Sequence, residues 1–305
     1  MRIVSLLPAA TEICCALGLG DDLVGVSPEC DHPPAVVGKR IVSRGFLSYD
    51  GKSSGETSRM VGERLENGGA LYQVDERALR LTEPEVILTQ GLCEVCAPTL
   101  GDVEEVASRL PQPPSIVSLD PHCLEDVFAD VERIGRFCDA SDRARILVRS
   151  LRARIGRVSS RASKAGARPE AVCLEWLDPV FLAGHWVPEM VGLAGGHDAL
   201  ATPAEASRRV SPREIVDAAP EVAVLMPCGF GLDRTREEAT LVTQAPWWRD
   251  LPAARTNRVW TVDGSSYFNR PGPRLVDGLE ILAHILQPEL FPSPPDPRDG
   301  RPWVG

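Results

Sequence analysis

The sequence predicts an α/β fold of two similar lobes connected by a long helical segment, and three observations support this prediction. In the first third of the chain, short apolar runs alternate with helical patterns, which is typical of βαβ units around a parallel sheet. A similar alternation returns after residue 166. Between the two, apolar residues recur at spacings near three and four with few turn residues, as in an amphipathic helix.

The first lobe is predicted to cover residues 1–123. Its strands are expected at residues 3–6, 23–26, 86–89 and 116–119. A helix is expected at 11–18, ended by Gly18, and another at 75–83, stopped by Pro84. In the second of these helices, Leu79 and Leu81 are expected to face inward.

The rest of the chain divides into a connection, a second lobe and a tail. The connecting helical backbone is predicted at 124–165, with a break near 139–142. The second lobe is predicted at 166–291, with strands at 171–174, 222–226 and 259–262 and helices at 188–194, 212–218 and 274–286. The tail, 292–305, is rich in Pro, Asp and Gly and is expected to be mobile or to lie over the surface.

Composition excludes several classes of protein. The 305 residues are 43 % hydrophobic and 25 % charged, as in ordinary globular proteins. A net charge of -10 argues against a protein that binds nucleic-acid phosphates. No apolar run reaches the length of about 18 residues that a membrane span needs.

Cysteine usage and the first residues predict a cytoplasmic protein. Nine scattered cysteines, an odd number, favour free thiols in a reducing compartment over a disulfide framework. A strand pattern starts at residue 2, where a signal peptide would instead show a basic start and a longer apolar run. If the start codon lies further upstream, the expectation changes to a periplasmic protein or a lipoprotein.

A short internal repeat indicates that the two lobes are similar. Residues 76–79 precede a Pro-Glu step and the apolar run 86–88, and residues 212–215 precede another Pro-Glu step and the run 222–224. Each copy reads as a helix, a turn, a buried strand and a loop with a cysteine. The repeat predicts a duplicated architecture whose two loops face one cleft.

The N-terminal segments carry a family resemblance. They are RIVSLLPAATE at 2–12, ALGLG at 16–20, LVGV at 23–26 and DHP at 31–33. Together with the segments PEVILTQ and PEVAVLM, they resemble the substrate-binding proteins of cobalamin and iron-siderophore ABC transporters, the class III periplasmic-binding-protein fold. The resemblance extends over residues 1–290.

This resemblance implies a fold, a ligand class and a partner. The fold would be two Rossmann-like lobes joined by a long rigid helix, with the ligand cleft between the lobes. The ligand would be cobalamin, another corrinoid or a related metal-chelate, and no reaction would be catalysed. An exported protein would dock onto an ABC permease through Glu76 and Glu214. The chain departs from the family in its apparent lack of a leader and in an extra segment at 43–72.

Candidate ligand-binding residues follow the predicted strands, because ligands of open α/β sheets bind beyond the carboxyl ends of the strands. They are Pro8, Thr11, Gln90, Cys93, Cys96, Glu175, Trp176, His185, Trp186, Glu189, Cys228, Phe230, Tyr267 and Arg270. Indole faces suit a flat ligand, and an imidazole can ligate a metal or form hydrogen bonds. Alternatively, the two indoles are core residues and His185 ends a turn.

The pair Cys93 and Cys96 allows a second function. Two thiolates at this spacing can share a metal ion or form a redox disulfide, and Cys228 offers a third sulfur. The alternative is that these cysteines pack as small hydrophobic residues. The competing hypothesis is therefore a metal-thiolate or redox enzyme, although the chain lacks the common nucleotide-binding, hydrolase and zinc-protease motifs.

Overall fold

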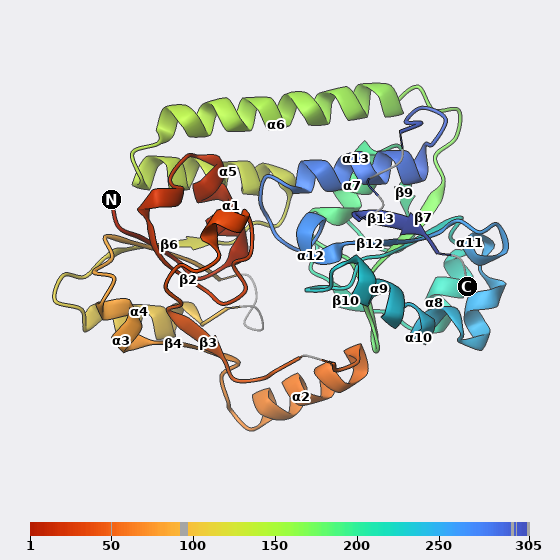
Figure 1. Cartoon of the computed structure of the whole chain (residues 1–305). Helices are drawn as coiled ribbons and strands as arrows, with labels where there is room; N and C mark the ends of the chain where they lie inside the picture. The colour runs from red at the N-terminus through yellow and green to blue at the C-terminus, as the bar shows by residue number, and fades with distance from the viewer. Residues whose placement is uncertain (50, 92–96, 294–295, 297, 304–305) are drawn as a thin grey trace. The chain divides into compact units, whose positions relative to one another are not determined.

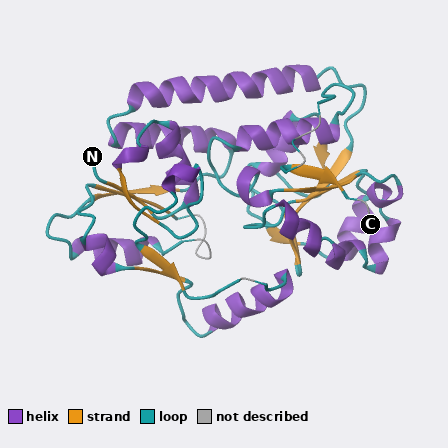
Figure 2. Cartoon of the chain, in the orientation of Figure 1, coloured by secondary structure: helices purple, strands orange, loops and turns teal. Residues whose placement is uncertain are grey.

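The computed structural model describes residues 1–49, 51–91, 97–293, 296 and 298–303, which form two compact α/β units. The first unit comprises Met1–Lys52, Glu56–Pro121 and Glu125–Ser150, and the second comprises Ser53–Gly55, His122–Leu124 and Leu151–Gly305. Figure 1 follows the chain through both, and Figure 2 shows strands enclosed by helices in each unit. The α/β fold with parallel sheets is thereby confirmed.

The first unit is built on a four-stranded parallel sheet of order β2-β1-β5-β6. Its strands are β1 (Ile3–Ser5), β2 (Leu23–Val26), β5 (Val86–Gln90) and β6 (Ser115–Leu119). Its helices are α1 (Pro8–Ala16), α2 (Ser54–Glu66), α3 (Glu76–Arg80) and α4 (Leu100–Ser108), with short 3-10 turns at Gly20–Asp22 and Pro34–Val36. Helix α1 begins three residues before the predicted start, because Pro8 occupies the first helical turn, where its missing N–H costs no hydrogen bond.

The core of the first unit joins one face of this sheet to the helices beside it. Val4, Leu6 and Ile87 contribute from the sheet, and Leu79, Val103 and Ala107 contribute from α3 and α4. The extra segment at 43–72 contains α2 and part of a two-stranded antiparallel sheet, β3 (Ser43–Gly45) with β4 (Tyr72–Val74). Val42 and Val74, which flank the segment, belong to the same core, so both ends of the segment are anchored on the first unit.

The second unit contains a longer, mixed sheet of order β10-β8-β7-β11-β12-β13. Its strands are β7 (Glu170–Leu177), β8 (Val180–Leu182), β9 (His197–Asp198), β10 (Arg208–Arg209), β11 (Val222–Leu225), β12 (Val259–Val262) and β13 (Gly300–Pro302). Strands β7, β11 and β12 are parallel, and β9 runs parallel to the start of β7. Its helices are α7 (Val187–Leu193), α8 (Pro212–Ala218), α9 (Leu232–Glu238), α10 (Thr240–Thr243), α11 (Pro252–Arg255), α12 (Gly264–Tyr267) and α13 (Leu275–Leu286), with a 3-10 turn, η3, at Pro246–Asp250.

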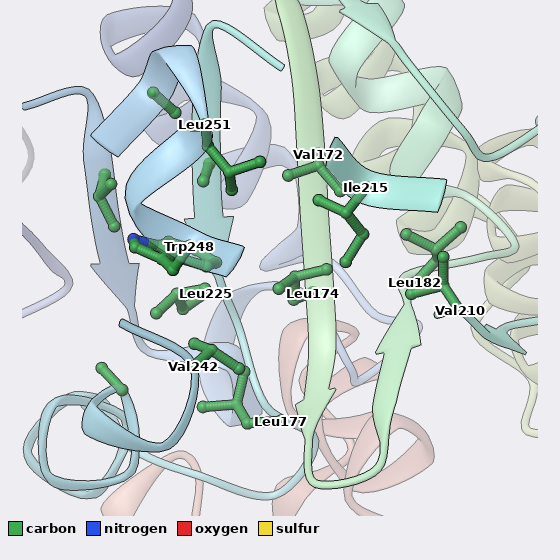
Figure 3. Packing of buried hydrophobic residues seen from close by; sticks show 14 residues of the cluster. Val172, Leu174, Leu177, Leu182, Val210, Ile215, Leu225, Val242, Trp248 and Leu251 are labelled. Carbon is green, nitrogen blue, oxygen red and sulfur yellow. The ribbon is translucent and has the colours of Figure 1, made fainter. Parts of the chain in front are cut away.

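Alternation along the central strand divides the apolar residues of the second unit between two faces. Val172 and Leu174 of β7 point into a cluster with Ile215 of α8 and with Trp248 and Leu251 of the η3 region (Figure 3). Each of these five side chains is almost completely buried. Hydrophobic packing therefore fixes the sheet of the second unit against α8 and the η3 region on this face.

Two helices occupy the predicted connecting segment, α5 (Leu124–Phe137) and α6 (Ser141–Ala162). They are separated at 138–140, where Asp139 has a positive φ of 51°, and the division between the two units falls within α6. Arg154 of α6 pairs with Glu280 and Asp277 of α13, and these carboxylates raise the pKa of its guanidinium.

Two local expectations were wrong. Leu81 is 63 % exposed, because α3 ends at Arg80 and the residue after it no longer shares the inward face of Leu79. The tail was expected to be mobile or to lie over the surface, but β13 pairs antiparallel with β12 and Trp303 packs on the core of the second unit. The backbone hydrogen bonds between β13 and β12 hold the tail in place, although its sequence contains few apolar residues.

Asp130 of α5 provides a test of how burial affects the stability of the first unit. Its side chain is buried, Oδ2 has no hydrogen-bond partner among the described residues, and burial raises its pKa to about 6. The folded state therefore holds a proton that the unfolded state loses, and stability falls as pH rises from about 4 to 6. Asp130→Asn should raise the free energy of unfolding by about 1 to 2 kcal/mol at pH 8 and leave it unchanged near pH 4.

Urea denaturation at both pH values measures this difference. The control is Asp217→Asn, which alters an exposed aspartate that pairs with Arg213. An Asp130→Asn variant that is less stable than the wild type at pH 8 would contradict the prediction.

Candidate functional site

The candidate site lies at the carboxyl edge of the second unit's sheet, beside β7 and β11. From β7 the chain turns back as β8 and passes on to β9 on the same side, and it later returns as β11 on the other side of β7. In open α/β sheets, ligands bind beyond the carboxyl ends of the strands at a reversal of strand order. The backbone N–H of Cys228, just after β11, donates to the carbonyl of Glu175 near the end of β7 at 2.9 Å. This bond places the two loop starts side by side.

Glu175 is the most perturbed carboxyl group of this edge. Burial raises its pKa to about 7, although hydrogen bonds from the Ser207 hydroxyl and the Gly184 backbone partly oppose that rise. At neutral pH the group is therefore divided between its acid and carboxylate forms. It can both donate and accept a hydrogen bond, which suits a ligand with amide groups.

An aromatic and cationic group stands beside Glu175. The Trp176 ring lies 5.3 Å from the Phe230 ring, and the Arg234 guanidinium lies 3.7 Å above the Phe230 ring. The Trp176 indole N–H donates to the carbonyl of Asp178 at 3.0 Å, which fixes the ring. The group thus combines apolar faces with one positive charge.

His185 follows β8 in a backbone conformation that is uncommon for this residue type, with φ at 53°. Two hydrogen bonds hold it there: its N–H donates to the carbonyl of Glu205 at 2.6 Å, and its carbonyl accepts from Ala204 at 2.9 Å. Gly184, just before it, is in close contact with the backbone at Ala206 and Glu205. Strained backbone of this kind is concentrated at functional sites.

Trp186 and Glu189 take supporting positions in the same segment. Trp186 is buried, and its indole N–H donates to the carbonyl of Phe268 at 2.7 Å, so its edge is already occupied. The carboxylate of Glu189 accepts the backbone N–H of Leu124 at 3.0 Å. His122, two residues before Leu124, has its ring 5.7 Å from the His185 ring.

The remaining candidates of the second unit lie beyond β12. The Tyr267 hydroxyl donates to Asp299 at 2.8 Å, and burial together with this bond raises the pKa of Tyr267. Arg270 is half-buried in the following turn, and its carbonyl accepts from Gly272. Tyr267 therefore links the segment before β13 to the end of β12.

Three candidates belong to the first unit. Pro8 opens α1 and is partly exposed, and Gln90 ends β5 almost completely buried. Thr11 is fully buried, and its hydroxyl donates to Ser5 Oγ at 2.8 Å and lies 3.0 Å from Cys30 Sγ. Thr11 thus stabilises the base of α1, a use that the sequence pattern did not reveal.

The thiol hypothesis depends on residues that the structure does not describe. Cys93 and Cys96 lie outside the described residues, while Cys228 is a half-buried free cysteine. Among the described ranges, no group of three or more His, Cys, Asp or Glu side chains could hold a metal ion. The metal site of Cys93, Cys96 and Cys228 therefore stays a prediction.

The two predicted docking residues are both half-exposed and engaged in ion pairs. Glu76 pairs with Arg80 and Arg109 at 3.3 and 3.1 Å. Glu214 forms a capping box with Ser211 and pairs with Arg208. The backbone N–H of Ser211 makes the largest contribution to lowering the pKa of Glu214 to about 2, followed by Arg208. Both carboxylates are thus oriented at the start of a helix.

Comparison with known proteins identifies the family. The family model described as "Periplasmic binding protein" matches residues 78–265, which is more than half of the chain. The chain belongs to this family. The matched range contains the second repeat of helix, Pro-Glu step and strand, most of the first repeat, and Glu175, Trp176 and Phe230 of the candidate site.

Curated relatives match the chain almost from end to end. The vitamin B12-binding protein of Vibrio parahaemolyticus is 24 % identical over 286 residues, which cover 93 % of this chain and 89 % of that protein. An uncharacterized ABC transporter substrate-binding lipoprotein of Bacillus subtilis, YvrC, is 23 % identical and covers 95 % of this chain and 81 % of its own length. The family resemblance predicted from the N-terminal segments is confirmed.

Solved structures share the fold. The periplasmic vitamin B12-binding protein BtuF of Vibrio cholerae has a TM-score of 0.66 and 21 % identity, with 94 % of this chain and 96 % of that chain covered. A periplasmic heme-binding protein of Pseudomonas aeruginosa has a TM-score of 0.70 and 20 % identity, with 96 % and 94 % covered.

These relatives decide between the two predicted function classes. They are solute-binding proteins, so the expectation of a non-catalytic binding protein is confirmed and the enzyme hypothesis is not. The expected cytoplasmic location finds no support, because the relatives are periplasmic proteins or a lipoprotein. Within the described residues, no helix is both long and apolar enough to cross a membrane.

Proposed function

We propose that this substrate-binding protein carries a corrinoid of the vitamin B12 class to an ABC permease. The observation that carries the proposal is the group formed by Glu175, Trp176, Phe230 and Arg234 at the carboxyl edge of β7 and β11. The end-to-end similarity to vitamin B12-binding proteins of Vibrio supports the same ligand class.

The chemistry of the group suits a corrinoid. A corrinoid presents a broad, flat ring edged with amide side chains. The Trp176 and Phe230 rings can stack against the flat surface, and the half-protonated Glu175 can exchange hydrogen bonds with the amides. Arg234 adds a cation for the phosphate that complete cobalamins carry.

We further propose that Glu76 and Glu214 contact the permease. Each carboxylate is half-exposed and held by an arginine, so its orientation is set before docking. A permease partner requires the protein to act outside the cytoplasmic membrane, and fractionation of the host cells tests that location.

Calorimetric titration with cobinamide and cyanocobalamin tests the ligand class. The double variant Trp176→Ala/Phe230→Ala should lose about 2 kcal/mol of binding free energy, or about thirtyfold in affinity, because two stacking surfaces are removed. The matched control is Trp247→Ala, which removes an indole from η3 at the core of the second unit.

Two results would contradict the proposal. The first is an absence of binding to either corrinoid at high micromolar concentration by a folded wild-type protein. The second is an equal loss of affinity in the Trp247→Ala control. Binding of hemin without binding of corrinoids would move the proposal to a different tetrapyrrole.

A further inference from the structure

Residues 143–169 form the longest stretch of the chain without an acidic residue. Nine of the 33 basic residues lie in this stretch, whereas all 43 acidic residues lie elsewhere. The stretch is therefore strongly cationic, although the whole protein has a net charge of -10. Eight of the nine basic residues are arginines, and the planar guanidinium group matches the oxygens of a phosphate. This composition suits contact with a partner that carries phosphate groups.

Most of this stretch belongs to α6, which Figure 1 shows as one unbroken helix. One face of α6 is apolar and buried, and it comprises Ala144, Val148, Leu151, Val158 and Ala162. The helical period of about 3.6 residues places Ile146, Arg149 and Arg157 together on the opposite face. Ile146 is 66 % exposed, and both arginines are exposed. These three residues are called the outer face of α6 below.

The two arginines of the outer face have no ion-pair partner among the described residues. Two of their neighbours on α6 differ in this respect, because Arg145 pairs with Asp142 and Arg154 pairs with carboxylates of α13. Within the part of the chain that the structure describes, the charges of Arg149 and Arg157 are thus not neutralised by an ion pair. They remain available to an external partner.

We propose that the outer face of α6 binds the headgroups of an anionic phospholipid bilayer. Such a bilayer presents phosphates in a plane above an apolar layer, and a helix of 22 residues can lie along it for about 30 Å. Arg149 and Arg157 contact the phosphates, and Ile146 enters the apolar layer. Duplex DNA also presents phosphates, but its backbone offers an exposed isoleucine no apolar layer to enter.

The net negative charge of the protein opposes this binding only weakly at physiological salt. The Debye length is then about 8 Å, so acidic residues farther than this from the bilayer are largely screened. Each basic residue near the bilayer surface contributes about fivefold to the binding constant. The local charge of the outer face therefore outweighs the net charge of the chain. The outer face contains none of the candidate ligand-binding residues, so bilayer binding and ligand binding can be measured independently.

Sedimentation of the full-length protein with vesicles at about 0.15 M salt tests this binding. The protein should bind vesicles made of equal amounts of phosphatidylglycerol and phosphatidylcholine, and it should not bind vesicles of phosphatidylcholine alone. Arg149→Gln/Arg157→Gln should weaken binding to the anionic vesicles by about thirtyfold, which is the combined contribution of two basic residues. Ile146→Ser should weaken it by about threefold to tenfold, because an aliphatic side chain no longer enters the apolar layer.

The matched control is Arg213→Gln/Arg255→Gln, which also removes two positive charges from exposed arginines but takes them from α8 and α11. This control should bind the anionic vesicles as tightly as the wild type does. Every variant should unfold at the wild-type temperature, since the substituted side chains are exposed.

Three results would overturn the inference: absence of wild-type binding to the anionic vesicles, an equal loss of binding in the two double variants, and wild-type binding by Arg149→Gln/Arg157→Gln. Tighter binding to a DNA duplex than to the anionic vesicles, unaffected by Ile146→Ser, would also overturn it and assign the outer face to nucleic acid. None of these results depends on a corrinoid, so bilayer binding can fail while the proposed function holds.

Discussion

Replacement of Gly184 by alanine is expected to destabilise the second unit by about 2 to 3 kcal/mol, the range of overpacking in a region that cannot move. An added Cβ would lie 2.6 Å from the carbonyl carbon of Ala206 and 2.7 Å from the carbonyl oxygen of Glu205. Both contacts are with backbone, so no side-chain rotation can relieve them. The Gly184 amide also donates to Glu175, so the loop shift should weaken ligand binding as well.

Thermal unfolding and corrinoid titration of the same preparation measure the two effects. Gly156→Ala is the matched control, because that glycine is exposed within α6 and an added Cβ meets nothing within 4 Å. The control should be stabilised by about 0.5 to 1 kcal/mol, as expected for alanine in place of glycine in a helix. A Gly184→Ala variant as stable as the wild type would contradict the prediction.

The second large effect is expected from Glu175, which should make the free energy of unfolding fall as pH rises. Burial raises its pKa from 4.5 to about 7 in the folded state, so the folded protein holds a proton that the unfolded chain loses between these values. Stability should therefore decrease across pH 4.5 to 7 and then level off. Glu175→Gln removes the titration and should be more stable than the wild type by about 2 to 3 kcal/mol at pH 8.

The measurement is the free energy of unfolding at pH 4.5, 6 and 8 for both proteins. The difference between them should be near zero at the lowest pH and greatest at the highest. Glu104→Gln, an exposed carboxylate of α4, should follow the wild-type curve at all three. A constant difference across the series would show that the substitution acts through packing rather than through the proton.

Local sequence patterns predicted the parallel strands of the two main sheets, because most of these strands are short, mainly apolar runs with strong boundaries. The run 222–226 was expected, and β11 covers Val222–Leu225. The helix at 212–218 was predicted with both bounds, because Pro212 starts it and Ser211 with Glu214 completes a capping box. By contrast, β13 could not be predicted, since its pairing with β12 depends on a partner about 40 residues away.

The site was predictable only where it follows the rule of strand ends. Glu175, Trp176 and Cys228 were proposed this way, and the structure brings their loops together, while their role in binding stays a prediction. The three side chains missed by this rule are His122, Ser207 and Arg234, which reach the site from separate segments. No local pattern distinguishes His122 from an ordinary loop histidine, because its neighbour His185 is distant in the sequence.

Because β13 follows β12 by about 40 residues, it is synthesised well after the strand that it covers. The first unit needs only residues up to Ser150, so its sheet can form while the ribosome is still producing the rest. The second unit needs Gly300–Pro302 to cover the edge of β12. Until those residues emerge, β12 presents an unpaired edge of the kind that recruits strands from other chains. The newly made second unit is thus most vulnerable to misassembly before β13 has been synthesised.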